Sequence, residues 1–195
     1  MKILIPKCYV RPSEMKSGAE ELPLPLFFLA GPIRGGGDWQ YQMSLTLRHE
    51  MEELSREFVI ACPSRWKDDH PLAPYFVKSP EGFEYQLNWE RYYLGLAGSY
   101  NHPGCVIFWL PRESKEFPHP GPEPYAMDTR GELGEWRWRM KTEKARVVIG
   151  AESEFFGLSQ IQRNFDQALG GGFTIHRTME ETASAAIGKV ILGDL

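Results

Sequence analysis

The sequence predicts an α/β fold in which a parallel sheet carries helices on both faces. Two observations predict it. Short apolar runs recur along the 195 residues, and each is nearly continuous, which is typical of strands covered on both faces. Segments with helical period separate these runs, so strand and helix alternate along the chain. This alternation requires right-handed crossovers and produces a doubly wound sheet.

Five apolar runs are the expected strands. They are residues 26–30, 58–62, 105–110, 146–149 and 173–175. Because a segment with helical period follows each run, we expect a flavodoxin-like sheet of five parallel strands.

Five segments with helical period are the expected helices. They are residues 39–54, 84–97, 131–141, 159–169 and 179–192. No internal repeat or low-complexity linker divides the chain. We therefore expect one domain over residues 1–195, in which residues 1–24 form an N-terminal extension that precedes the expected elements.

Composition excludes several classes of protein. The net charge of -4 and the sequence pI of about 5.8 argue against a nucleic-acid-binding protein, which would be basic. No apolar run approaches the roughly 18 residues that cross a bilayer. The start of the chain does not resemble a secretory signal. Cys8, Cys62 and Cys105 form no close pair. We expect a cytoplasmic protein that binds neither a nucleic-acid polymer nor a membrane.

Loop lengths indicate where a ligand binds. Three strand-to-helix connections are long, namely residues 31–38, 63–83 and 111–127, whereas the helix-to-strand connections are short. The long connections all leave the carboxyl ends of parallel strands, which meet at one rim of the sheet and form the ligand crevice in open α/β folds. Long loops in compact domains are commonly functional.

The first of these loops is rich in glycine. Gly31 and Gly35 allow the backbone to approach a ligand, and the helix that follows begins with free N–H groups that attract anions. Arg34 adds a guanidinium suited to phosphate. The alternative is a structural turn in which Asp38 caps the helix that begins at Trp39.

The helix expected over residues 84–97 carries a polar face near its start. Gln86 and Glu90 are four residues apart, and Trp89 is three residues from Gln86, so all three lie on one side. An amide, a carboxylate and an indole together suit a planar base and its sugar. The alternative is a solvent-facing helix in which Trp89 packs against the preceding loop.

A third motif follows the long loop 111–127. Thr129 and Glu132 have the spacing of a capping box, in which Glu132 only bonds to the backbone. The functional interpretation places the same carboxylate, ionised at a helix start, on the ligand rim, as a nucleophile requires. Residue spacing alone does not decide between the two.

Taken together, these segments resemble the nucleoside 2-deoxyribosyltransferase-like superfamily, which includes nucleotide N-glycoside hydrolases. The resemblance covers roughly residues 25–150. It is carried, in the family's order, by Phe28-Leu29-Ala30-Gly31-Pro32-Ile33, Asp38-Trp39-Gln40, Gln86-x-x-Trp89-Glu90, Phe108-Trp109-Leu110-Pro111 and Glu132-Leu133-Gly134.

The resemblance implies catalytic roles for three carboxylates. Glu132 matches the glutamate that attacks the anomeric carbon and forms a glycosyl-enzyme intermediate. Glu90 matches the acidic residue that handles the leaving base, although the family's transferases often have Asp there. Asp128 resembles a carboxylate that holds the sugar or the nucleophile, but it lies closer to Glu132 than in the transferases. The chemistry is that of a retaining glycosidase.

The resemblance also implies a set of binding residues. Arg34-Gly35-Gly36 resembles the loop that binds the 5′-phosphate in the family's nucleotide hydrolases, and a helix start at Thr129 and Arg130 is suited to the same phosphate. The full expected substrate-binding set is Gly31, Arg34, Gly35, Asp38, Trp39, Gln86, Trp89, Thr129 and Arg130.

Three functions remain open at this point. The first is cleavage or transfer of the N-glycosidic bond of a nucleoside or nucleotide. The second is a nucleoside 5′-monophosphate N-glycoside hydrolase, with water as acceptor. The third is a nucleotide-binding module without catalysis. No motif requires a metal or an organic cofactor, and the resemblance implies a homo-oligomer.

Overall fold

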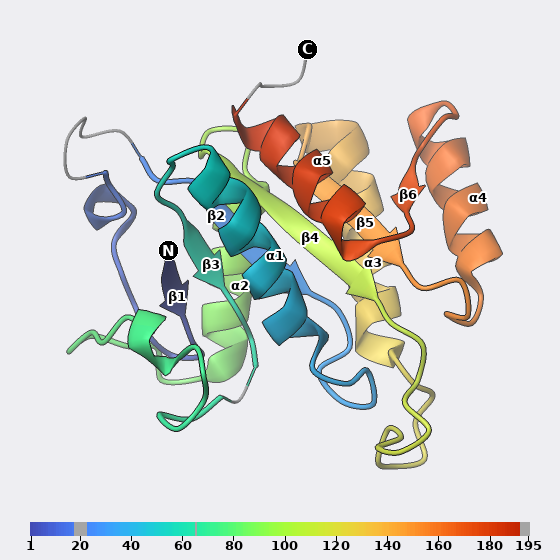
Figure 1. Ribbon diagram of the computed structural model, residues 1–195. Helices are drawn as coiled ribbons and strands as arrows, with labels where there is room; N and C mark the ends of the chain where they lie inside the picture. The colour runs from blue at the N-terminus through green and yellow to red at the C-terminus, as the bar shows by residue number, and fades with distance from the viewer. Residues whose placement is uncertain (18–22, 65, 192–195) are drawn as a thin grey trace.

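One parallel sheet with helices on both faces organises the chain (Figure 1). The computed structural model describes residues 1–17, 23–64 and 66–191. Within these ranges the strands are β1 (Lys2–Leu4), β2 (Leu26–Ala30), β3 (Val59–Ala61), β4 (Gly104–Leu110), β5 (Val147–Ala151) and β6 (Ile175–His176).

Five α-helices and two short 3₁₀ helices connect the strands described above. The α-helices are α1 (Trp39–Glu53), α2 (Gln86–Gly98), α3 (Met127–Glu143), α4 (Leu158–Leu169) and α5 (Met179–Ile191). The 3₁₀ helices are η1 (Pro12–Glu14) and η2 (Ala73–Tyr75). None of the helices in the described ranges has the length and apolarity that a bilayer crossing demands.

The order of the strands across the sheet is β1-β3-β2-β4-β5-β6, and every pairing is parallel. Without β1, this is the flavodoxin-like order 2-1-3-4-5. The sequence prediction of a doubly wound, flavodoxin-like sheet is therefore confirmed. The direction of strand order reverses between β2 and β4, which is the topological switch point of the sheet.

The prediction of five strands was wrong by one. Lys2–Leu4 forms a sixth strand, β1, which pairs with β3 at the edge of the sheet, and Ile3 and Leu4 are fully buried there. The assignment of residues 1–24 to an extension was therefore wrong for β1, while its residues 18–22 lie outside the described residues. A strand of three residues ahead of Pro6 is too short to produce a recognisable apolar run.

The five expected helices are all present, and their boundaries agree closely except at α3. This helix begins at Met127, four residues before the expected start at Gly131. The low helix propensity of Gly131 does not stop the helix, because Thr129 and Leu133 on the same helix are buried against the sheet. The last expected helical residue, 192, lies outside the described residues.

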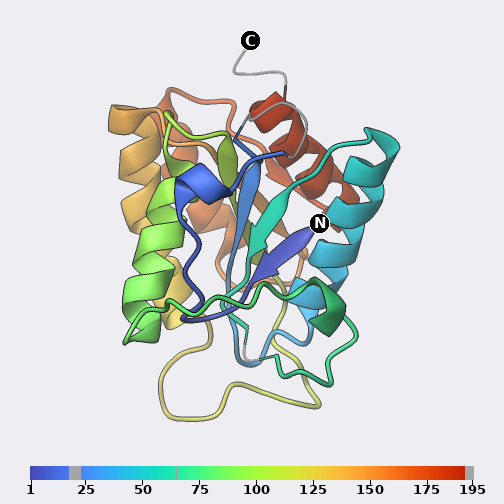
Figure 2. The ribbon, with the colours of Figure 1, turned by 90° about the vertical axis from the view of Figure 1, so that its left-hand side faces the viewer.

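Two apolar layers hold the helices to the sheet, one on each face. Figure 2, which views the sheet from its β1 edge, shows α2 and α3 on one side and α1 and α5 on the other. The first layer joins α2, α3 and α4 to β2, β4 and β5, and contains the fully buried Trp89, Tyr93 and Trp136. The second joins α1 and α5 to the opposite sheet face.

The three long loops gather at the carboxyl ends of the strands, as the sequence predicts (Figure 1). The loop after β2 leads to α1 on one face of the sheet, and the loop after β4 leads to α3 on the other. The ends of β2 and β4 therefore face a rim that no helix covers, and the loops themselves build the surface there.

Two glycines of α2 provide a test of the packing between α2 and α3. A Cβ added at Gly98 would overlap the ring of Trp136, whereas a Cβ at Gly95 would meet no atom within 4 Å. We predict that Gly98→Ala lowers the free energy of unfolding by about 2 kcal/mol, because a close-packed ring must move. Gly95→Ala should raise it by about 0.5 kcal/mol through helix propensity. Urea unfolding measures both, and equal effects at the two positions would contradict the packing.

Candidate active site

The glycine-rich loop begins with a tight contact in the sheet. Gly31 has a φ of +147°, and a Cβ there would overlap the backbone oxygen of Trp109 and the ring of Trp39. Trp39 itself is buried, and its indole N–H donates to the backbone oxygen of Pro32 at 2.8 Å. Gly31 and Trp39 therefore fix the loop to the end of β4. The burial of Trp39 and the close contacts of Gly31 with Trp109 and Trp39 do not support the expectation that these two residues contact substrate directly.

Further along, the glycine-rich loop packs against the loop that follows β4. The amide of Ser114 donates to the Gly35 oxygen at 2.6 Å, and a Cβ at Gly35 would lie 2.8 Å from the His119 nitrogen. A Cβ at Gly36 would lie 2.8 Å from Pro111 Cγ. These contacts require glycine for close approach between backbones, so Gly35 is occupied by a protein contact.

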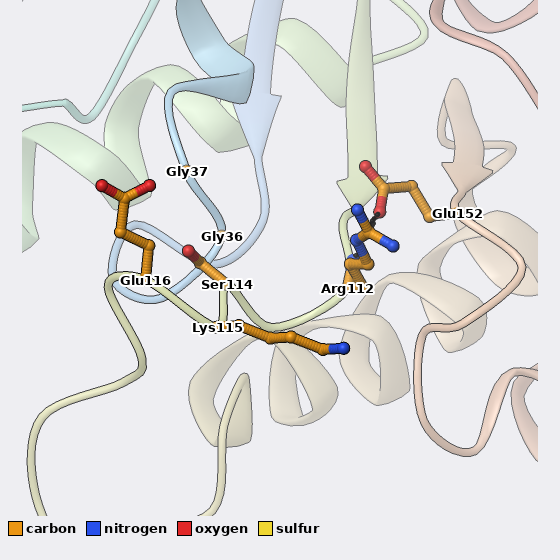
Figure 3. Close-up of a pocket in the computed structure, with 7 residues that line it drawn as sticks. All are labelled: Gly36, Gly37, Arg112, Ser114, Lys115, Glu116 and Glu152. Atoms are coloured by element: carbon orange, nitrogen blue, oxygen red, sulfur yellow. Dashed lines mark hydrogen bonds and ion pairs between the residues drawn. The ribbon is translucent and has the colours of Figure 1, made fainter.

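A pocket of about 330 Å³ opens where these two loops meet the end of β5. Figure 3 shows Gly36 and Gly37 from the glycine-rich loop together with side chains of the segment after β4. The lining residues are Gly36, Gly37, Arg112, Ser114, Lys115, Glu116 and Glu152. The pocket lies at the switch point between β2 and β4, the position at which open α/β sheets bind ligands.

The charges of this pocket are mixed. Arg112 Nε lies 3.7 Å from a Glu152 oxygen, and its Nη1 lies 3.6 Å from a Glu154 oxygen. The backbone amide of Arg112 also donates to Glu152 at 3.1 Å. These carboxylates offset the guanidinium charge, so the pocket is a polar cavity with little net positive charge.

The side chain of Asp38 lies beside His70 and does not bond to the backbone of α1. Its side chain makes no cap hydrogen bond, and one of its carboxylate oxygens lies 4.0 Å from His70 Nε2. The His70 ring stacks on Trp66 at 4.3 Å, and its Nδ1 accepts the Leu72 amide at 3.2 Å. Asp38 does hold the N-cap position of α1, as the alternative interpretation expects, but without the side-chain cap hydrogen bond. The contact between Asp38 and His70 joins the loop 63–83 to the glycine-rich loop.

On α2, Gln86 and Glu90 interact as their spacing predicts, because Gln86 Nε2 donates to a Glu90 oxygen at 2.7 Å. Both side chains are half-buried. Trp89 behaves differently, since it is fully buried, and its indole N–H donates to the Cys8 oxygen at 2.9 Å. Its ring packs near Phe28. Trp89 is thus a core residue whose position does not support a direct role in reading a base.

The start of α3 does not form the capping box. The N-cap position is Ala126, with a left-handed φ of 59° and no side-chain cap, and Thr129 lies inside the helix with 4% of its surface exposed. Arg130 donates from Nη2 to the Phe156 oxygen at 2.6 Å, and its guanidinium lies over the Phe155 ring. Because Thr129 is buried and Arg130 is engaged, neither is placed to hold a phosphate.

The same helix presents a row of carboxylates on another side. Asp128, Glu132 and Glu135 are spaced at i, i+4 and i+7, so they share one face of α3. This face lies near Glu90 of α2, because Glu90 is the charged group that acts most strongly on Glu132. We call Glu90, Asp128 and Glu132 the acid cluster. It brings together all three residues that sequence analysis expected to be catalytic.

The surroundings of the acid cluster disfavour the ionised form of Glu132. Burial, together with the negative charges of Glu90, Asp128 and Glu135, raises the pKa of Glu132 to about 7. The described groups that act on Glu132 are all negative. Glu132 therefore does not remain fully ionised at neutral pH, contrary to the expectation from a helix start. It lies in the second turn of α3, beyond the strongest influence of the helix dipole.

The acid cluster and the pocket are distinct parts of the rim. Glu90, Asp128 and Glu132 are not among the residues that line the pocket, which belongs to the glycine-rich loop and to the ends of β4 and β5. Arg34 lies in that loop, is exposed, and forms no ion pair with a described residue. Among the residues expected to bind phosphate, it is the one whose charge remains available.

Several residues of this region were missed by sequence analysis. His70 and Tyr125 lie in long loops whose conformation has no periodic signal, so their contacts with the glycine-rich loop could not be predicted. Glu135 could have been found, since it lies three residues after Glu132 on a predicted helix. No group of three or more His, Cys, Asp or Glu in the described ranges is arranged to hold a metal ion.

Comparisons of the chain with protein-family models, with curated proteins and with solved structures find no match. The resemblance drawn from the sequence motifs therefore remains a hypothesis, and the site has to be interpreted from its own geometry.

The raised pKa of Glu132 has a consequence for stability. A carboxyl whose pKa is about 7 in the folded chain and near 4.5 when unfolded favours folding at low pH and loses that contribution as pH rises through 7. We predict that Glu132→Gln raises the free energy of unfolding by about 2 kcal/mol at pH 8, and that the difference shrinks towards pH 5. Urea unfolding across this pH range measures the effect.

The matched control is Glu57→Gln, an exposed glutamate at the end of the loop that precedes β3. This substitution should leave the free energy of unfolding within about 0.5 kcal/mol of the native chain at every pH. A Glu132→Gln protein that is less stable than the native chain at pH 8 would show that the fold stabilises the ionised carboxylate. That result would contradict the claim that burial and like charges disfavour ionised Glu132.

Proposed function

We propose that this chain cleaves or transfers the N-glycosidic bond of a nucleoside or a nucleoside 5′-monophosphate, with Glu132 as the nucleophile. The observation that carries the proposal is the acid cluster itself. Two helices that start at the ligand rim bring three carboxylates together, and Glu132 is half-buried among like charges. Such an arrangement lowers stability and is typical of catalytic sites.

The charge of the acid cluster suits this reaction. Departure of a base from C1′ of a sugar develops positive charge on the ring, as in an oxocarbenium ion. Fixed negative charges in a partly dehydrated site stabilise that charge as it forms, and they need no reorganisation at that moment. Asp128 and the ionised form of Glu132 would supply such charges, and the described charged groups that act on Glu132 include no cation that would weaken them.

The proposed steps follow the logic of a retaining glycosidase. A Glu132 carboxylate oxygen bonds to C1′, the C1′–N bond breaks, and its electron pair leaves with the base nitrogen, which takes a proton from Glu90. Water or a second base then attacks C1′, gives a proton to Glu90, and releases Glu132. Water as acceptor gives hydrolysis, and a base gives transfer. Asp128 would hold a sugar hydroxyl.

The pKa of Glu132 sets a condition on the first step. At about 7, the carboxyl is partly protonated in the empty enzyme at neutral pH, and only its ionised form can attack. The rate should therefore rise with pH as Glu132 loses its proton. The opposite assignment, with Glu132 as proton donor, would make the rate fall over the same range.

A second candidate, a hydrolase of nucleoside 5′-monophosphates, is favoured by the position of Arg34. Its exposed guanidinium stands in the glycine-rich loop, next to the pocket at the switch point. A cation there is separated from the acid cluster, so a phosphate could bind without meeting the carboxylates. This candidate shares the chemistry above and adds a requirement for phosphate.

We also propose that the chain works in the cytoplasm. Cys8 and Cys62 are free thiols, as a reducing cytoplasm would leave them. Association of identical chains is proposed from the resemblance alone.

We predict that wild-type protein releases or exchanges a base from a panel of nucleosides and 5′-monophosphates, and that Glu132→Ala lowers turnover at least about 10³-fold because the attacking atom is lost. For the wild type, kcat/KM should rise with pH with an apparent pKa near 7. Chromatography of the products, with and without an added acceptor base, measures rate, substrate and acceptor together.

Glu143→Ala is the matched control, because it removes an exposed glutamate from the end of the same helix. It should keep wild-type turnover. Full activity in a folded Glu132→Ala protein would refute the nucleophile. A wild-type rate that falls above pH 7 would assign Glu132 to proton donation, and ligand binding without turnover would favour a binding module.

We also predict that Arg34→Ala raises KM for 5′-monophosphates by about tenfold and leaves KM for the matching nucleosides within about twofold, because only the former offer a phosphate. Steady-state kinetics with paired substrates measures the ratio. Arg56→Ala, at an exposed position before β3, is the control for the loss of a surface arginine. Equal effects of Arg34→Ala on both substrate classes would argue against a phosphate contact there.

A further inference from the structure

Tyr125 joins three elements of the ligand rim. Its hydroxyl donates to the backbone oxygen of Pro111, directly after β4, at 2.9 Å. The same hydroxyl lies against the glycine-rich loop, since a Cβ at Gly36 would approach it to 3.0 Å. Its ring packs at 6.1 Å from that of Phe155, which follows β5. One side chain thus touches the loops after β2, β4 and β5.

The contact matters because α3 begins without a cap. Ala126 adopts a left-handed conformation, and no side chain bonds to the free amides of the first turn. Two contacts hold this turn in place of a cap. Tyr125 ties the residue before the helix to Pro111, and Arg130 ties the first turn to the Phe156 oxygen at 2.6 Å.

The Tyr125 hydroxyl keeps its proton at any working pH. Burial raises the pKa of Tyr125 above its ordinary value, and the charges of Glu113 and Glu152 raise it further. It therefore acts as a constant hydrogen-bond donor. Phe in its place would keep the ring contact with Phe155 and lose only the bond to Pro111.

Asp128 and Glu132 lie on α3, three and seven residues after Tyr125, which precedes the helix. A shift at the start of α3 therefore moves both carboxylates relative to the glycine-rich loop. We propose that Tyr125 is a positioning residue that sets the distance between the acid cluster and the glycine-rich loop by holding the start of α3 to the end of β4. The inference rests on the proposed function for its kinetic consequence.

Displacement of a nucleophile by about 1 Å costs up to roughly 10²-fold in rate, because the reacting atoms no longer meet at the required geometry. Binding of substrate depends less on that alignment. Loss of the Tyr125 hydroxyl should therefore lower kcat more than it changes KM. It should also admit water around Glu132 and so lower the pKa of that carboxyl towards its ordinary value.

The experiment compares Tyr125→Phe with the wild type in two measurements. We expect kcat to fall about 10- to 100-fold with KM within about threefold. We also expect the pKa of Glu132, followed by NMR of labelled glutamate side chains in the ligand-free protein, to fall by about half a unit or more. Tyr100→Phe, at an exposed tyrosine before β4, removes a hydroxyl elsewhere and should change neither measurement.

Gly36→Ala provides an independent approach to the same contact. Its added Cβ would press on the hydroxyl and on Pro111 Cγ, so it should lower kcat and the pKa of Glu132 in the same direction. If Tyr125→Phe does not fold, Gly36→Ala still tests whether this contact affects kcat and the pKa of Glu132.

The outcomes separate this inference from the proposed function. An unchanged pKa of Glu132 in both variants overturns the inference, whatever happens to kcat, because Tyr125 would then not act through α3. A lower pKa with unchanged kcat overturns it too. A lower pKa in a protein that turns over no substrate supports the positioning role and refutes the proposed function.

Discussion

The parallel course of all strands, with crossovers to opposite faces after β2 and β4, is the constraint on which the ligand rim depends. It places α1 on one face and α3 on the other, and leaves the carboxyl ends of these two strands without a covering helix. The loops at this rim must therefore form the surface by packing against one another. Gly31 against the Trp109 oxygen, and Gly35 against the His119 backbone, show how closely the backbones approach to do so.

The acid cluster is set into this frame at a cost to stability. Thr129, Leu133 and Trp136 anchor α3 in the core, and the same helical geometry turns Asp128 and Glu132 towards Glu90. Apolar packing of α3 therefore holds like charges together that would otherwise separate. Proteins retain such an arrangement where activity needs it, since replacement by neutral side chains would stabilise the fold.

Periodicity predicted the elements, because buried strands and amphipathic helices leave a repeating signal, and Gln86 with Glu90 was predicted from the same rule. Periodicity did not predict the features that follow no repeating pattern. The three-residue strand β1 is too short to stand out. Thr129 and Glu132 have the spacing of a capping box, yet the helix starts two residues before Thr129, which is buried inside it. Trp39 and Trp89 were expected at the ligand, but their indole N–H groups find backbone oxygens in the interior, and no local pattern predicts that.

Electrostatics restrict how a substrate can lie at the rim. A phosphate next to Glu90, Asp128 and Glu132 would add negative charge to a site in which burial and negative charge already raise the pKa of Glu132 to about 7. In the proposed reaction, a positive charge that develops at the same place would lower that pKa and favour the ionised form of Glu132. Under the proposed function, the sugar carbon would therefore lie at the acid cluster and any phosphate at the glycine-rich loop, beside Arg34 and the pocket. The distance between the acid cluster and the glycine-rich loop would then determine whether the sugar and the phosphate bind at the same time. Tyr125 lies at the contact that we propose sets this distance.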